Sequence, residues 1–75
     1  MSIKKAMYDT ALAELEAQRD KALATARIYL EHPVGIGEHP QVIDEFIKQI
    51  KIAAEADEAA SMLIDTFRDE LIPED

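Results

Sequence analysis

Two copies of the triplet Glu-His-Pro, at positions 31–33 and 38–40, bring together side chains that can bind a metal ion. Imidazole nitrogens and carboxylate oxygens are ordinary ligands of zinc and similar ions. His32, His39 and Glu38 are therefore candidate ligands, and association of several chains would multiply them. Neither histidine stands three or four residues from a second ligand on a helix, as in rigid helical metal sites. We therefore predict no metal or cofactor, and keep a weak metal site in this segment as an alternative.

The same segment holds Gly35 and Gly37 shortly before a predicted helix. A glycine-rich turn at a helix N-terminus can bind phosphate. Here no strand precedes the glycines, and no lysine, serine or threonine follows at the spacing of a nucleotide-binding loop. A tight turn that needs positive φ angles explains the glycines better. The predicted turn residues are Pro33, Gly35, Gly37 and Pro40.

No residue pattern in this sequence predicts catalysis. The only serines are Ser2 and Ser61, one near a terminus and one inside a predicted helix, and there is no cysteine. No nucleophile therefore stands near a base, and neither a disulfide nor a thiolate zinc site can form. We predict no catalytic residue and no enzymatic activity. A domain of this size then depends on helix packing and self-association for stability.

The elements that position these residues are two long helices. Apart from Pro73, every glycine and proline lies between positions 33 and 40, and both flanks are rich in strong helix formers. We predict an all-α, antiparallel two-helix hairpin, with one helix over about 3–31, a turn over 32–39 and a second helix over about 40–71. Residues 1–75 form one domain, and each helix is about 45 Å long.

Each predicted helix carries a seam of residues with coiled-coil spacing. In the second helix the gaps alternate between three and four residues, with one charged member. In the first helix the seam is less apolar, and antiparallel pairing would place Ala22 beside Ile50 and Tyr29 beside Ile43. The second seam is Ile43, Phe46, Ile50, Ala53, Asp57, Ala60, Ile64, Phe67 and Leu71. The first is Tyr8, Leu12, Leu15, Arg19, Ala22, Ala26 and Tyr29.

The second helix is apolar beyond its seam, at Val42, Ile47 and Leu63 among others. So wide an apolar arc needs more than one neighbouring helix. We therefore predict a homodimer that completes a four-helix bundle, with a trimer of six helices as the second choice. The residues predicted to form the core or the oligomer contacts are Leu12, Leu15, Tyr29, Ile43, Phe46, Ile50, Leu63, Ile64 and Phe67.

Arg19 and Asp57 are the only charged members of the two seams. The predicted pairing puts Asp57 level with Leu15, about one helical turn from Arg19 and within reach of its side chain. We predict that the two form a buried ion pair that fixes the register or the oligomeric state. Alternatively, both side chains reach solvent at the edge of the bundle.

The net charge of −8 limits the partners of this protein. Residues 53–75 hold eight acidic side chains and a single basic one, Arg68, so direct binding to nucleic acid is not expected. No apolar run reaches the ~20 residues of a membrane span, and the N-terminus does not resemble a signal peptide. We predict a cytoplasmic, non-enzymatic, self-associating interaction protein. The alternative is an acidic inhibitor or nucleic-acid mimic that binds a basic protein.

Residues 28–47, and above all the stretch Pro33-Val-Gly-Ile-Gly-Glu-His39, resemble small uncharacterised helical-hairpin proteins of marine tailed bacteriophages. These occur notably in myoviruses of cyanobacteria and in related marine metagenome sequences, and a similar turn joins two predicted helices in them. The resemblance covers roughly residues 25–60. It implies a phage or marine source and a setting in the host cell cytoplasm, and it brings no functional residues with it.

Overall fold

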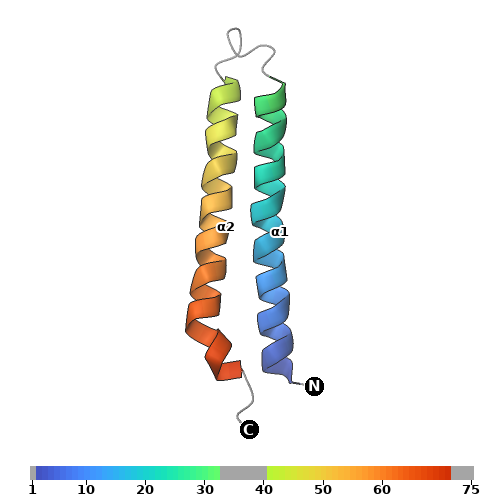
Figure 1. Ribbon diagram of the computed structural model, residues 1–75, viewed down its shortest axis with the longest axis vertical. Helices are drawn as coiled ribbons and strands as arrows, with labels where there is room; N and C mark the ends of the chain where they lie inside the picture. Colours follow the sequence, from blue (N-terminus) through green and yellow to red (C-terminus); the bar gives the residue numbers. More distant parts are fainter. Residues whose placement is uncertain (1, 33–40, 72–75) are drawn as a thin grey trace.

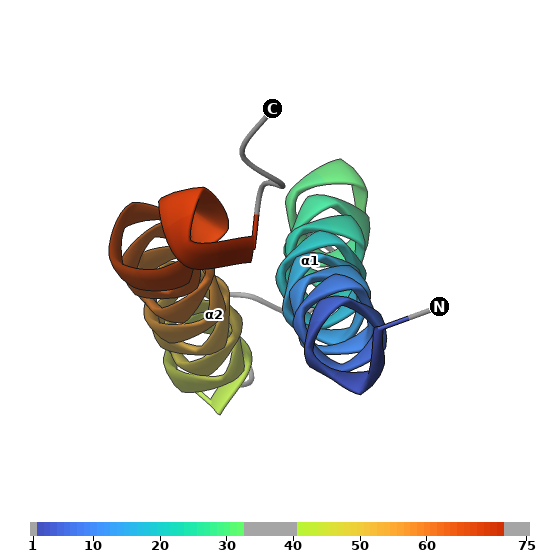
Figure 2. The ribbon, with the colours of Figure 1, turned by 90° about the horizontal axis from the view of Figure 1, so that it is seen from below.

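The computed structural model describes residues 2–32 and 41–71, which form two antiparallel helices lying side by side (Figure 1). Helix α1 spans Ile3–Glu31 and helix α2 spans Gln41–Leu71. The predicted all-α hairpin is confirmed, with α2 described from Gln41 onward. Viewed along the helices, the molecule is a single pair of helices (Figure 2), 60 Å long and only 18 by 15 Å across. No described element therefore covers either broad side of the hairpin.

Helix α1 begins and ends where its flanking residues predict. The Ser2 hydroxyl accepts a hydrogen bond from the backbone N–H of Lys5 at 3.3 Å, which satisfies one of the free donors of the first turn. At the other end, His32 leaves helical geometry with φ −124° and ψ 70°, since a residue before proline disfavours the helical region. Its N–H still donates to the Ile28 carbonyl at 3.0 Å.

The contact between the helices is made of alanines. In the part of the chain that the structure describes, the five buried hydrophobic residues are all alanine, and no large side chain is fully buried. Small side chains at these positions let the two helices approach closely, because interaxial distance follows the size of the contacting side chains. The buried residues are Ala22 and Ala26 on α1, and Ala53, Ala56 and Ala60 on α2. A hairpin with this core leaves its large apolar side chains near the surface.

On α1 the predicted seam is the one that faces α2. All seven of its members, from Tyr8 to Tyr29, are buried or half-buried in the hairpin. Among them Arg19 is the charged residue that reaches across to the other helix. The spacing of apolar residues in this half of the sequence therefore predicts the buried side of α1 correctly.

Helix α2 is rotated away from its predicted orientation. Ile43 and Ile50, expected to face α1, are 50% and 41% exposed. Phe46, Ala53 and Ala60 do lie on the buried side, but Gln49 and Ala56 share it instead of Ile50 and Asp57. The expected placement of Ile43 beside Tyr29 and of Ile50 beside Ala22 therefore needs correction. Compared with the predicted orientation, α2 is turned about its own axis by roughly 50°, which is half of the roughly 100° between successive residues. This rotation brings the alanines of α2 against α1.

Candidate interaction surfaces

Large apolar side chains gather on one broad side of the hairpin, in the half nearest the turn. Leu30 is 65% exposed and Ile47 is 45% exposed, in addition to Ile43 and Ile50. The three isoleucines are spaced four and three residues apart, so they lie on one side of α2. Leu23, half-buried, lies seven residues before Leu30 on α1. We call this surface the turn-half face: Leu23, Leu30, Ile43, Ile47 and Ile50.

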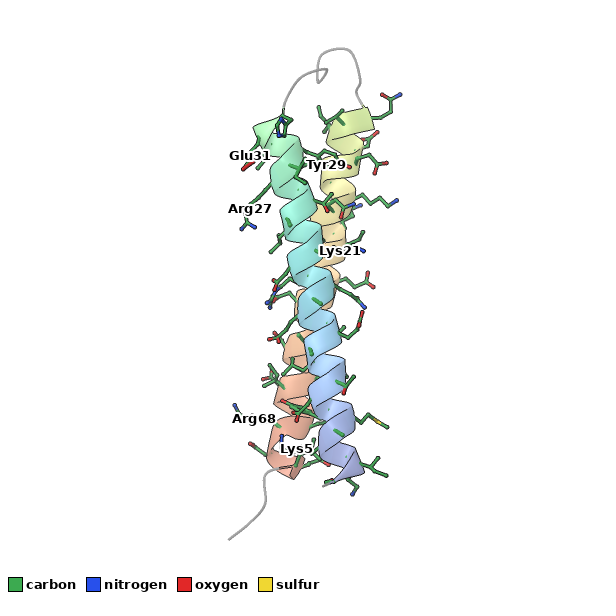
Figure 3. All side chains as sticks on the ribbon, turned by 90° about the vertical axis from the view of Figure 1, so that its right-hand side faces the viewer. Lys5, Lys21, Arg27, Tyr29, Glu31 and Arg68 are labelled. Atoms are coloured by element: carbon green, nitrogen blue, oxygen red, sulfur yellow. The ribbon has the colours of Figure 1, made fainter. Side chains whose placement is uncertain are left out.

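Two observations place these residues on the same side of the molecule. The Arg19 guanidinium forms an ion pair with Asp57 at 3.3 Å, and helical spacing puts Arg19 in line with Leu23 and Asp57 in line with Ile50. Figure 3 shows Arg27 and Arg68, which are in line with Leu23 and Asp57, projecting to one side, whereas Lys21 projects to the other. The turn-half face thus ends at the Arg19–Asp57 pair.

A second apolar surface lies on the opposite broad side, at the end of the hairpin where α1 begins and α2 ends. It is a groove of about 450 Å³. Met7 is 69% exposed and Phe67 is 45% exposed. We call it the open-end groove, and its lining residues are Lys4, Met7, Tyr8, Ala11, Leu63, Phe67, Glu70 and Leu71. The groove runs between α1 and α2, so both helices contribute to its floor.

The two halves of the hairpin differ in charge. The half next to the turn, residues 18–32 and 41–56, has five basic and five acidic side chains, which gives a net charge of zero. The open half, residues 2–17 and 57–71, has eight acidic side chains against three basic ones, which gives a net charge of −5. One apolar surface therefore lies in a neutral half of the molecule and the other lies in an acidic half.

The predicted pair of Arg19 and Asp57 forms within the chain, but it is not buried in the single hairpin as expected. Arg19 also contacts Asp20 at 3.0 Å, and the hydrogen bonds to Asp20 and Asp57 raise the pKa of Arg19 above its ordinary value. The resulting stabilisation is fully present below the pKa that Arg19 has in the unfolded chain. It is lost only as pH rises through the higher pKa that Arg19 has in the folded protein. The guanidinium is therefore charged throughout the neutral range. The Asp57 side chain remains 61% exposed in the single hairpin.

Of the predicted core and oligomer residues, six are half-buried in the hairpin: Leu12, Leu15, Tyr29, Phe46, Leu63 and Ile64. The other three, Ile43, Ile50 and Phe67, are exposed. Met7, Ala11 and Ile52 belong to surfaces that the sequence reasoning did not identify. The available signal is the four-residue spacing from Met7 to Ala11 and from Leu63 to Phe67, which places the two residues of each pair on the same side of their helix.

The predicted turn chemistry falls mostly on residues that the structure does not describe. Glu38 and His39 lie there, as do Pro33, Gly35, Gly37 and Pro40. His32 is exposed at the end of α1, and residues 2–32 and 41–71 hold no group of three His, Asp or Glu side chains arranged for a metal ion. The metal-site alternative therefore stays a prediction.

Within those same two ranges, neither helix is long and apolar enough to cross a membrane. Comparison of the chain with protein-family models, with curated proteins and with solved structures gives no match. The resemblance to phage proteins therefore stays an expectation.

Proposed function

We propose that this chain is a non-enzymatic interaction protein that self-associates through the turn-half face. In this proposal, two hairpins bury that face against each other and complete a four-helix bundle. The observation that carries it is the all-alanine core together with exposed Leu30, Ile43, Ile47 and Ile50. Burying the remaining half of such a side chain contributes roughly 1 kcal/mol, and a C2 dimer gains this on both protomers.

The charge distribution supports the turn-half face as the self-contact. Residues 18–32 and 41–56 together have no net charge, so two copies can approach there with little repulsion. Two open halves, each with a net charge of −5, would repel at low ionic strength. The opposite broad side is therefore left to solvent or to another partner in the proposed dimer.

Melting at several protein concentrations tests self-association. A dimer whose folding and association are coupled melts at a higher temperature when it is more concentrated. With the average unfolding enthalpy for two such chains, we expect roughly 5 °C per tenfold change in concentration. Circular dichroism at 222 nm between about 1 and 100 µM measures it. A melting temperature that is independent of concentration would contradict the proposal.

We further propose that Asp57 limits the assembly to a dimer by ending the turn-half face with a charge. Replacement of Asp57 by leucine would continue the apolar surface toward Ile64, while Arg19 would keep Asp20 as an ionic partner. We expect D57L to stay helical and to sediment partly as species larger than a dimer. The control is E58L, one residue away on the outer side of α2. An unchanged oligomeric state of D57L would contradict this role.

The nucleic-acid-mimic alternative needs a continuous acidic stripe. Asp44 and Glu55 line a shallow surface depression together with Lys48 and Lys51, so bases and acids alternate on the outer side of α2 near the turn. The acidic excess is restricted to the open half. This distribution favours an interaction protein with one acidic end over a mimic of a nucleic-acid backbone.

A further inference from the structure

The open-end groove remains uncovered in the proposed dimer, because it lies on the broad side opposite the turn-half face. Its floor is apolar and is shared by the two helices: Met7 and Ala11 come from α1, and Leu63 and Phe67 come from α2. Met7 is the most exposed of its apolar lining residues, at 69%. An apolar surface of this kind, rimmed by charged residues, marks an interaction site more often than it marks plain solvent.

The shape of the groove suits a helix. Its lining residues extend over positions 4–11 of α1 and 63–71 of α2, which corresponds to roughly 12 Å, or about two helical turns. A third helix that lies between two others presents side chains at spacings of three and four residues. Two or three such apolar side chains would fill the groove between Met7 and Phe67.

The charges around the groove select the sequence of that helix. Glu70 is among its lining residues, and Glu14 lies seven residues beyond Met7 on the same side of α1. The open half, counted over both broad sides, carries a net charge of −5. Lys4 is the basic residue in the lining, whereas the other lysine of the first turn, Lys5, is paired with Asp9 at 2.7 Å. A positively charged ligand is therefore attracted, and the acidic open half of a second copy of this chain is repelled.

We infer that the open-end groove binds an amphipathic helix of another protein, with apolar residues in the groove and lysine or arginine residues beside it. The inference rests on the proposed role as an interaction protein and names the class of partner. It places self-association and partner binding on opposite broad sides, so that one hairpin can engage a second copy and a basic helix together.

Fluorescence anisotropy with a labelled 18-residue peptide tests the inference on the full chain. The probe has leucine at alternating spacings of three and four residues and lysine at the remaining positions. We expect saturable binding that M7A and F67A each weaken about tenfold or more, the effect of a central interface side chain. M62A is the matched control, because Met62 is similarly exposed at 64% but does not line the groove. Raising NaCl from about 0.05 to 0.5 M should weaken binding several-fold.

Three kinds of result would overturn the inference. The first is equal binding of a peptide with the same residues and scrambled leucine positions, or of one with glutamate in place of lysine. The second is no saturable binding at all, or the same loss for M62A as for M7A. The third is dissociation of the dimer by M7A or F67A, which would mean that a second copy occupies the groove. A monomeric wild-type chain that still binds the peptide in the groove would contradict the proposed dimer and leave this inference standing.

Discussion

The variant I47E is expected to be monomeric at concentrations at which the wild-type chain is dimeric. Ile47 is 45% exposed in the hairpin, between Ile43 and Ile50. In a symmetric dimer each substitution occurs twice, so two carboxylates would enter the apolar contact. Burying an unpaired charge costs several kcal/mol, and about 4 kcal/mol corresponds to a thousandfold weaker association. Sedimentation equilibrium measures the change directly.

We also expect I47E to lose helical content as it dissociates. A two-helix hairpin held by five small alanines buries little apolar surface, so most of its stability should come from association. The fractional loss of ellipticity at 222 nm on dilution reports this coupling.

Ile52 supplies the matched control for I47E. It is the same residue type on the same helix with a similar exposed fraction of 39%. It shares the outer depression of α2 with Ile47, but it also lines a small depression with Leu15 and Gln18, on the broad side that carries the open-end groove. We expect I52E to remain dimeric and helical. If both variants dissociate, or if neither does, the turn-half face is not the dimer contact.

The variant A22L is expected to destabilise the protein by about 1–3 kcal/mol, the usual cost of inserting a larger side chain into a well-packed contact. Ala22 is the most buried residue of the hairpin, at 2% exposed. A leucine there would push α1 away from the alanines of α2. The melting temperature should fall by roughly 10 °C, given 4–8 °C per kcal/mol for a domain of this size.

The control for A22L is A24L, two residues along the same helix. Ala24 is exposed, and leucine and alanine are both good helix formers, so A24L should change the free energy of unfolding by less than about 0.5 kcal/mol. Urea titrations followed by circular dichroism give both values. An A22L variant as stable as A24L would mean that the alanine contact does not determine the spacing of the helices.

The boundaries of the hairpin were predictable because the sequence separates its helix formers from its glycines and prolines. Pro33 ends α1 by restricting His32, and Ser2 offers the hydroxyl that caps its first turn. The long-range pair between Arg19 and Asp57, 38 residues apart, was also predictable. Once the two helices are antiparallel and joined by a short connection, their register places Arg19 and Asp57 about one helical turn apart, within reach of the long arginine side chain.

The rotation of α2 was not predictable from apolar spacing alone. Val42 and Ala56 fit an apolar seam as well as Ile43 and Asp57 do, because α2 is apolar on both flanks. Periodicity therefore permits two orientations that differ by about 50°. Packing selects the one in which Ala53, Ala56 and Ala60 meet α1. The open-end groove was missed for the same reason, since its α2 side, with Leu63 and Phe67, is placed only when the orientation of α2 is known.

Sedimentation equilibrium of the wild-type chain at about 10 µM, with circular dichroism of the same sample, tests the central claim most directly. The claim is that the hairpin is half of a four-helix bundle. We predict a single species with twice the 8.4 kDa mass of the chain and the helical content of two long helices. A mass three times that of the chain would indicate the six-helix arrangement instead. A fully helical monomer of 8.4 kDa would contradict the account.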